Sequence, residues 1–530
     1  MKQLYATAIF ILVLLISCKQ KQRKYIVKDT TITEKTSFNN LFFDSLQLDK
    51  FLDKDSSLLK YKEHFHDFYK QRNYEFAWFD KNGLAEQAYN FYNLLNNTVA
   101  EFQDSSIYNP KMLTSFDYFT THQIAKTKQE DVLNAELLMT GQFFDYAAKV
   151  YKGIDIDASE LGWFIPRKKV DLTALLDSVL STKAKEAEVY VPFNSQYKKL
   201  QEQLLQYYQI QKKYPVDTLA KTIKPLAKGD TSSLVSLIKH RLFLLGDLEE
   251  LDSTNKFDTT LQKAVKMFQL RNGLSVTGSI GNKTFDELNV PIKKRIETIL
   301  INIERARWLP AEKDSNYILV NIPEYKMHVF DSTINTWDMN VIVGKTATGT
   351  VIFNGNLRYI VFSPYWNIPS NIVKNEILPG IKKDKDYLIK NDMEKYGKGD
   401  SLPLIRQKSG EKNSLGLVKF LFPNNYDIYF HDTPNRDLFT ATNRSFSHGC
   451  IRLGEPKKLA EYLLRKDTTY TSSKIDSLMH LPKEKWVTLP KSIPVFIVYF
   501  TSWVDKNGKL NFRNDIYGHD NKMSEKLFVK

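Results

Sequence analysis

The spacing of apolar residues changes along this chain from a helical period to a strand period, and the change falls near residue 310. Over residues 41–214 apolar side chains recur three and four positions apart, for example around Phe91 and Leu95, as on one face of a helix. Beyond that point apolar residues alternate with polar or smaller ones, as at Ile318 and Val320, which is the period of a strand. The chain therefore has to form a helical N-terminal part and a mainly β C-terminal part, a multidomain α+β architecture.

Length and charge set broad limits. The 530 residues predict two to four domains, and 42% hydrophobic with 26% charged residues indicates globular rather than disordered protein. The net charge of +14 fits a polyanionic partner such as nucleic acid, an anionic membrane or an anionic wall polymer. We favour a lysine-rich solvated surface, because Glu and Lys are interleaved rather than blocked.

Only two cysteines occur, Cys18 and Cys450. Two thiols exclude a disulfide-rich scaffold and a metal cluster built from cysteine alone, although they would allow one disulfide. The fate of each thiol is therefore the main question for this chain.

The N-terminus is typical of an export signal. Lys2 precedes an apolar run over residues 8–16 that is too short to span a bilayer. The run ends in Leu15-Ile16-Ser17-Cys18, which resembles a bacterial lipoprotein lipobox; an uncleaved anchor is the alternative. We predict a signal peptide over residues 1–17, acyl chains on Cys18 that suffice for anchoring, and a polar tether over residues 18–40. Lys19 is not the acidic residue that retains lipoproteins in the inner membrane, so the periplasmic face of the outer membrane is favoured.

Two helical domains are predicted next, over residues 41–223 and 224–290. The second has short helices near residues 234–242, 261–269 and 284–288, separated by glycine-containing loops. It resembles the three-helix peptidoglycan-binding domain, with Thr277 where that family usually has Asp. A helical spacer without glycan binding is the alternative. Pro291 then favours a helix start, and residues 291–310 form the predicted linking helix.

The C-terminal domain, residues 311–530, is predicted to be mainly β. Strand candidates are residues 341–343, 359–362, 428–430 and 496–500, and Asp505-Lys506-Asn507-Gly508 is typical of a hairpin turn. Residues 371–425 lack a strand period and precede the chemical motif. We interpret them as a lid or capping insertion.

The strongest chemical motif is Ser447-His448-Gly449-Cys450-Ile451-Arg452, preceded by His431-Asp432. A thiol attacks as thiolate, and a nearby imidazole can accept its proton to give a thiolate–imidazolium pair. Lowering a thiol pKa by two units requires about 2.7 kcal/mol. Because Gly449 has no Cβ, the backbone N–H groups of Gly449 and Cys450 can approach a developing oxyanion. A zinc site from His431, His448 and Cys450 is disfavoured because no fourth ligand has the right spacing.

Together these motifs resemble the YkuD-type L,D-transpeptidases. The run from Gly410 to Asn424 and the segment Pro494–Asp505 resemble the large Gram-negative murein members, which carry a helical scaffold domain and a peptidoglycan-binding unit before the catalytic domain. The resemblance implies that Cys450 is the nucleophile and His431 the general base, with the backbone carbonyl of Asp432 orienting its ring. It places His448 and Gly449 near the oxyanion, and Ser447 and Arg452 in support of the site or a substrate carboxylate. Tyr365 and Trp366 are candidates for a substrate groove, although packing is favoured for Trp366.

The implied reaction needs no cofactor or metal. Cys450 attacks the carbonyl of the diamino acid at position three of a tetrapeptide stem, D-Ala leaves, and a neighbouring amine resolves the thioester to give a 3→3 cross-link. The resemblance also implies a role in cell-wall organisation and cell shape, and acylation of the thiol by carbapenems. Expected partners are peptidoglycan stems, the membrane through the lipid, and other wall-synthesis proteins, but no nucleic acid. The acceptor stays open: water, a free D-amino acid or a protein lysine would give carboxypeptidase, exchange or protein attachment.

Two further alternatives remain from the residues. Papain-like and NlpC-type enzymes place Cys before His in the chain, and the reverse order here disfavours them without excluding them. A non-catalytic wall-binding lipoprotein is the competitor from another class, and the intact Cys450 and His431 count against it.

Overall fold

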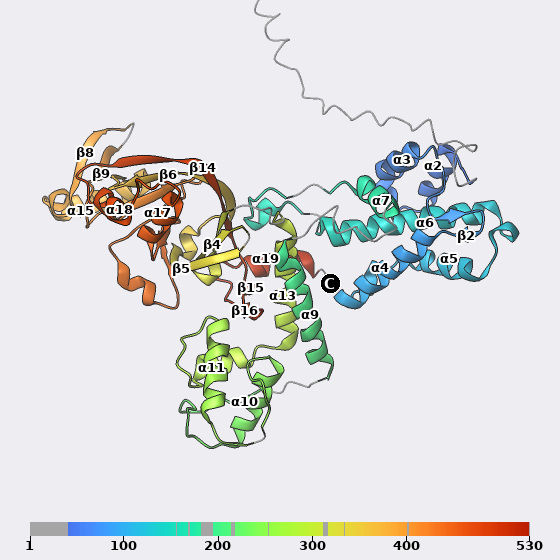
Figure 1. Ribbon diagram of the computed structural model, residues 1–530, viewed down its shortest axis with the longest axis horizontal. Helices are drawn as coiled ribbons and strands as arrows, with labels where there is room; N and C mark the ends of the chain where they lie inside the picture. The colour runs from blue at the N-terminus through green and yellow to red at the C-terminus, as the bar shows by residue number, and fades with distance from the viewer. Residues whose placement is uncertain are drawn as a thin grey trace, which may run out of the picture. The chain divides into compact units, whose positions relative to one another are not determined.

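The computed structural model describes residues 41–154, 156–167, 170–181, 194–213, 218–252, 254–310, 316–332, 334–399 and 402–528. The predicted signal peptide, the tether and Cys18 lie outside these residues. The chain divides into two compact units, residues 1–150 with 170–191 and residues 151–169 with 192–530; Figure 1 labels their elements. Within the described ranges, every helix is too short or too polar to cross a bilayer.

The first unit is mainly helical, which confirms the fold class predicted for the N-terminal part, although residues 151–169 and 192–223 of the predicted domain 41–223 belong to the second unit. Its core element is α6, most of whose residues are buried, in contact with α2, α4, α5 and α7. The buried Glu136 of α6 accepts hydrogen bonds from the backbone N–H groups of Ala77 and Trp78 and from the Tyr69 hydroxyl, and burial raises its pKa to about 7. The elements are α2 Ser45–Lys54, α3 Lys62–Gln71, β1 Phe79–Asp80, β2 Gly83–Leu84, α4 Glu86–Phe102, α5 Pro110–Thr121, α6 Gln129–Ala147 and α7 Leu172–Ser181.

The second unit contains the predicted three-helix domain, formed by α10 Ser233–Leu244, α11 Thr259–Arg271 and α12 Asn282–Leu288. Ser232 and Asp258 cap the first two helices by accepting backbone N–H groups, which otherwise lack partners at a helix start. Gln269 fixes the following loop, because its side chain accepts the N–H of Gly278 and donates to Ser279 O and to the hydroxyl of Thr277. Gly278 has a φ of +73°, which favours glycine. The core is formed by Val235, Ile238, Leu242, Phe257, Leu261, Val265, Phe268, Ile280, Phe285 and Leu288.

Two longer helices, α9 Ser195–Lys213 and α13 Ile292–Trp308, pack together beside this domain. Pro291 is the N-cap residue of α13. Arg271 joins the three-helix domain to its neighbour: it pairs with the buried Asp247 and donates to the carbonyl of Leu510. This domain is therefore held against the C-terminal hairpin by a buried, fully bonded arginine.

The C-terminal domain is a nine-stranded sheet in the order β12-β5-β13-β11-β10-β6-β14-β3-β4. The long strand β5 also pairs with β4, so eight of the strands close into a barrel with β12 attached outside the ring. The prediction of a mainly β domain is confirmed. The strands are β3 Tyr317–Asn321, β4 Lys326–Asp331, β5 Ile334–Gly344, β6 Phe353–Phe362, β10 Val418–Leu421, β11 Phe430–His431, β12 Ser445–Ser447, β13 Ile451–Leu453 and β14 Lys485–Val498.

Three helices and a hairpin complete this domain. The helices are α17 Pro456–Leu464, α18 Ser472–Met479 and α19 His519–Leu527. The hairpin joins β15 Ser502–Val504 to β16 Leu510–Phe512 through the turn predicted at Asp505–Gly508, where Gly508 has a φ of +75°.

The insertion differs from the prediction in its bounds and in having a hydrophobic core of its own. It runs from β7 to β9 and has a core of its own around Val373, Ile377 and Ile405, whereas residues 418–421, predicted to belong to it, form barrel strand β10. Its elements are too short to give a recognisable period, which is why its core escaped the sequence. They are β7 Trp366–Asn367, α14 Ser370–Ile372, the π-helical turn Val373–Ile377, α15 Leu378–Lys383, α16 Tyr387–Lys390, β8 Met393–Lys398 and β9 Pro403–Gln407.

A buried polar network ties the C-terminal helix α19 to α13. Arg305 of α13 donates to Asp520 of α19 at 2.6 Å, and the hydroxyl of Thr501 donates to the same carboxylate at 2.7 Å. Asn302 exchanges two hydrogen bonds with Thr501. Because the segment between Thr501 and Asp520 includes Tyr517, which contacts the loop behind the chemical motif, this network fixes part of the site.

Replacing Arg305 by Met is expected to lower the free energy of unfolding by about 3–5 kcal/mol, because it leaves the carboxylate of Asp520 buried without its cation. Guanidinium unfolding followed by tryptophan fluorescence measures the loss. Arg465→Met is the matched control, since Arg465 pairs with Asp331 at the surface and such pairs contribute about 1 kcal/mol or less. Equal losses in the two variants would contradict a structural role for the buried pair.

Candidate active site

Cys450 lies in the turn between β12 and β13. Gly449 has a φ of +122°, a conformation that strains any residue with a Cβ. The hydroxyl of Ser447 accepts the N–H of Gly449 at 3.1 Å and donates to the carbonyl of Cys450 at 2.6 Å. Ser447 therefore closes the turn, and Gly449 allows it.

The loop that follows β5 supports this turn from behind. The hydroxyl of Thr350 donates to the carbonyl of Gly449 at 2.8 Å and accepts the N–H of Gly344 at 2.9 Å. The Tyr517 hydroxyl donates to the carbonyl of Gly344 at 2.5 Å. Sequence reasoning missed both supports, because neither belongs to a motif and both lie far from Cys450 along the chain.

Strands β11 and β13 are parallel neighbours, and their register assembles the site. His431 pairs with Arg452, and the N–H of Ile451 donates to the carbonyl of Tyr429 at 3.1 Å. Tyr429 consequently lies beside Cys450, and its side chain and backbone both act to lower the pKa of the thiol. Tyr429 was not predicted, although it stands two residues before His431 and so projects to the same face of the strand.

The thiol of Cys450 is protonated at rest. Burial raises its pKa above the ordinary value, and the hydrogen bonds from Tyr429 and the charge of Arg452 offset only part of this effect. The sulfur lies 3.4 Å from the carbonyl of Asp427, to which it donates. The thiol is therefore positioned by its hydrogen bond but is not in the thiolate form that reacts.

The imidazole of His431 is neutral at rest. It is 5% exposed, and Nδ1 lies 2.5 Å from the carbonyl of Asp432. A carbonyl only accepts, so Nδ1 carries the proton and Nε2 is the free base. Burial, followed by the positive charges of Arg452 and Lys419, lowers the pKa of His431 to about 3 against the opposing effect of Asp432.

This arrangement differs from the thiolate–imidazolium pair expected from the sequence. Among the described residues no hydrogen bond joins His431 to Cys450. Burial penalises the charged form of both groups, so the thiol pKa rises while the imidazole pKa falls. An ion pair between them therefore has to form during the reaction rather than before it.

The carboxylate of Asp432 anchors the segment after His431. It accepts the N–H groups of Leu417 and Thr433 and pairs with Arg436 at 2.5 Å. Gly416, with a φ of +62°, lies so close that a Cβ there would overlap this carboxylate. Asp432 thus acts through both its backbone and its side chain.

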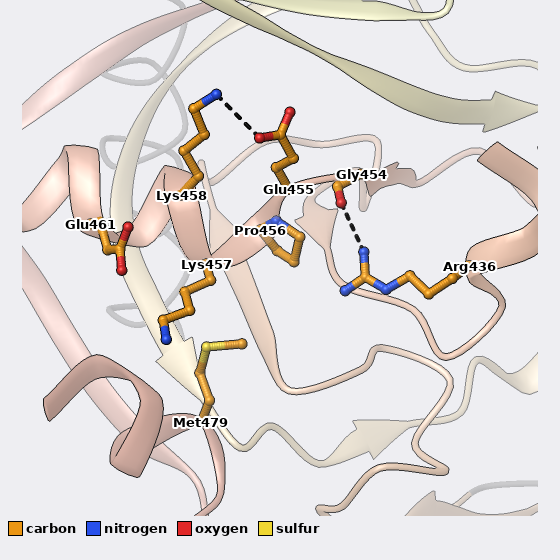
Figure 2. Close-up of a pocket in the computed structure, with 8 residues that line it drawn as sticks. All are labelled: Arg436, Gly454, Glu455, Pro456, Lys457, Lys458, Glu461 and Met479. Atoms are coloured by element: carbon orange, nitrogen blue, oxygen red, sulfur yellow. Dashed lines mark hydrogen bonds and ion pairs between the residues drawn. The ribbon is translucent and has the colours of Figure 1, made fainter. Parts of the chain in front are cut away.

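Arg436 also reaches a separate pocket of about 470 Å³. Figure 2 shows its guanidinium bonded to the carbonyl of Gly454, and Lys458 paired with Glu455. Lys457 on the same wall pairs with Asp476. The pocket contains none of the predicted site residues. Its cationic side chains Arg436, Lys457 and Lys458 are each paired with a carboxylate, so we do not place the reaction in this pocket.

The insertion reaches the turn that carries Cys450 through His448. The exposed imidazole of His448 lies 3.3 Å from the carboxylate of Glu376 in the π-helical turn. This contact places the insertion beside Cys450. Tyr365 stacks on Arg406, which pairs with Glu394, and Trp366 packs on the core of the insertion.

Comparison with known proteins identifies three parts of the chain. Residues 315–475 match the model of the YkuD "L,D-transpeptidase catalytic domain", residues 63–204 match the "Scaffold domain", and residues 231–288 match the "Putative peptidoglycan binding domain". A curated protein of Haemophilus influenzae, named "Putative L,D-transpeptidase", is 30% identical over 244 residues. The match spans 43% of this chain and about half, 49%, of that protein.

Solved structures give weaker global matches. An L,D-transpeptidase from Xylanimonas cellulosilytica is 12% identical, with 53% of this chain and 100% of that one covered and a TM-score of 0.18. One from Mycobacterium smegmatis is 13% identical, with 36% and 60% covered and a TM-score of 0.19. The domain matches carry the assignment: residues 315–475 match a YkuD-type L,D-transpeptidase catalytic domain, and matches to a scaffold domain and a peptidoglycan-binding domain precede it in the chain.

Proposed function

We propose that this protein is an L,D-transpeptidase that forms 3→3 cross-links between peptidoglycan stems through a thioester on Cys450. The observation that supports it best is a single free thiol on a glycine-dependent turn, next to a buried histidine whose Nδ1 is fixed by a carbonyl. Nucleophilic catalysis requires such a nucleophile, base and orienting group. The YkuD match covers all three residues.

The resting protonation states set the order of events. When the sulfur attacks the carbonyl of the donor stem, the thiol proton moves to Nε2 of His431 and the S–C bond forms. The carbonyl oxygen becomes an oxyanion, for which the N–H groups of Gly449 and Cys450 are the donors. Because the pKa of His431 is low, the imidazolium gives its proton readily to the leaving amine as the C–N bond breaks and D-Ala departs.

The second half-reaction reverses these roles. The acceptor amine attacks the thioester, loses a proton to His431, and the thiol of Cys450 is restored. Contact between Glu376 and His448 places the insertion beside the turn, and exclusion of water from a bound donor would favour an amine as acceptor. Water, a free D-amino acid or a protein lysine remain competing acceptors at the same site. Carbapenems are expected to acylate the same sulfur.

Purified protein lacking the lipid, incubated with disaccharide-tetrapeptide, is expected to release D-Ala and form dimers detectable by mass spectrometry. Cys450→Ala and His431→Ala should abolish both products, while His480→Ala, which changes an exposed histidine, should retain them. Tripeptide without dimer would contradict cross-linking. Unchanged dimer formation by Cys450→Ala would contradict the catalytic assignment and favour a non-catalytic wall-binding protein.

Alkylation of Cys450 by iodoacetamide, followed by peptide mass mapping to separate it from Cys18, should accelerate about tenfold per pH unit between pH 5 and 8. The reason is that only the thiolate reacts and its pKa is raised. Tyr429→Phe should slow alkylation further, since hydrogen bonds from Tyr429 stabilise the thiolate. A rate independent of pH across this window would reveal a preformed ion pair instead.

We further propose that the protein is exported and anchored by acyl chains on Cys18, at the periplasmic face of the outer membrane, where its substrate lies. Cells fed labelled palmitate should incorporate label into the wild-type protein and into Cys450→Ser. Cys18→Ser should carry none. Label that persists in Cys18→Ser would contradict a lipid anchor at this position.

A further inference from the structure

A row of paired residues crosses five neighbouring strands of the barrel and passes through His431. In order from β14 to β13, the register pairs Trp486 with Val361, Val361 with Lys419, Lys419 with His431, and His431 with Arg452. Paired residues project to the same face of a sheet, and neighbouring strands lie about 4.8 Å apart. Lys419 and Arg452 therefore flank His431 on the outer face of the barrel, with Cys450 on the β13 side.

Lys419 is a half-buried cation without a carboxylate partner. Among the described residues none forms a hydrogen bond or an ion pair with its ammonium, which lies 5.8 Å from the centre of the Trp486 ring. That distance is near the limit of a cation–π contact. Burial lowers the pKa of Lys419, with Glu484 as the nearby negative charge that opposes it.

The carboxylate of Glu484 is engaged elsewhere. One oxygen lies 3.1 Å from the indole N–H of Trp486, and the other lies 3.5 Å from the backbone N–H of Tyr365. Glu484 thus helps to fix the indole of Trp486 beside Lys419, but it does not form an ion pair with Lys419. A partly desolvated ammonium is costly unless an anion joins it, so this position is suited to an anion supplied from outside.

The order of groups along the row matches the order of atoms at the scissile bond. The attacked carbonyl carbon has to meet Cys450, and the leaving amide nitrogen has to meet His431, which protonates it. The next group along the leaving D-amino acid is its terminal carboxylate, two bonds beyond that nitrogen. The next side chain along the row after His431 is Lys419.

We infer that Lys419 binds the terminal carboxylate of the D-amino acid that leaves the donor stem. This inference rests on the proposed function and assigns a specificity residue to it. The opposing view is that Lys419 acts only through its charge, by keeping His431 neutral. The two views differ in whether the effect of Lys419 depends on the carboxylate of the substrate.

The test compares three donors, the tetrapeptide acid, its C-terminal amide, and the tetrapeptide with only the diamino-acid side-chain carboxylate amidated. With the acid, Lys419→Gln should raise KM about tenfold to a hundredfold, the value of a hydrogen bond between charged groups, with a smaller change in kcat. With the C-terminal amide, the wild type should already show the raised KM, and Lys419→Gln should add little. The side-chain amide should behave as the acid does.

Lys419→Arg should restore most of the affinity for the acid, because the cation is kept. Lys485→Gln is the matched control, since it removes an equal charge from an exposed position on β14 and should leave all three donors unaffected. An equal loss from Lys419→Gln on acid and C-terminal amide would overturn the inference. If Lys419→Gln instead raised the KM for the acid but not for the side-chain amide, Lys419 would bind the side-chain carboxylate, and the inference would also be overturned.

A binding measurement separates this inference from the proposed function. Calorimetric titration of Cys450→Ala with the acid and its C-terminal amide should show tighter binding of the acid, and Lys419→Gln in that background should remove the difference. If the wild type shows no turnover but the binding difference holds, the carboxylate site stands and the proposed reaction falls. If turnover occurs and no binding difference is found, the reaction stands and the inference falls.

Discussion

The site depends on the parallel pairing of two very short strands, β11 and β13. Their register places Tyr429 beside Cys450 and His431 beside Arg452, and a shift by one residue would turn these side chains into the barrel. Strands this short do not hold a register alone. The pairing is fixed from both sides, because β13 also pairs with β5 and β11 also pairs with β10. The pairings of β5 with β13 and of β10 with β11 therefore place Cys450 and His431 on one face of the barrel.

Burial of the site favours the neutral form of both Cys450 and His431. The thiol of Cys450 keeps its proton and the imidazole of His431 lacks one, so charge develops only as the sulfur attacks. A neutral thiol reacts slowly with oxidants, because oxidation follows the thiolate. This protection matters if the protein is exported, as we propose. In the proposed reaction, proton transfer from the thiol becomes favourable only when a substrate carbonyl is bound. The same burial thus protects the nucleophile at rest and leaves its activation to the bound complex.

Sequence reasoning found the fold class and the residues that carry a motif, since period and spacing are local properties. It found neither Tyr429 nor the supports at Thr350 and Tyr517, because their roles arise from strand register and from contacts between distant segments. Lys419 stood within a run used to identify the family, yet only the pairing with His431 gives it a place in the site. The insertion was recognised by its lack of period, but its own core and its end before β10 depend on packing among elements of a few residues each.

In the row through His431, the charge of Lys419 links binding of the donor carboxylate to the proton affinity of the imidazole. Lys419 lowers the proton affinity of His431 for as long as its charge is unpaired. A carboxylate bound to Lys419 neutralises that charge, so the proton affinity of the imidazole rises when a donor occupies the site and a base is needed. Departure of the D-amino acid, which has taken the proton as the C–N bond broke, removes the carboxylate and lowers the proton affinity again, so that the imidazole returns to its neutral resting state. A cation one strand away from His431 would in this way couple the presence of the donor stem to the strength of the base that accepts the thiol proton.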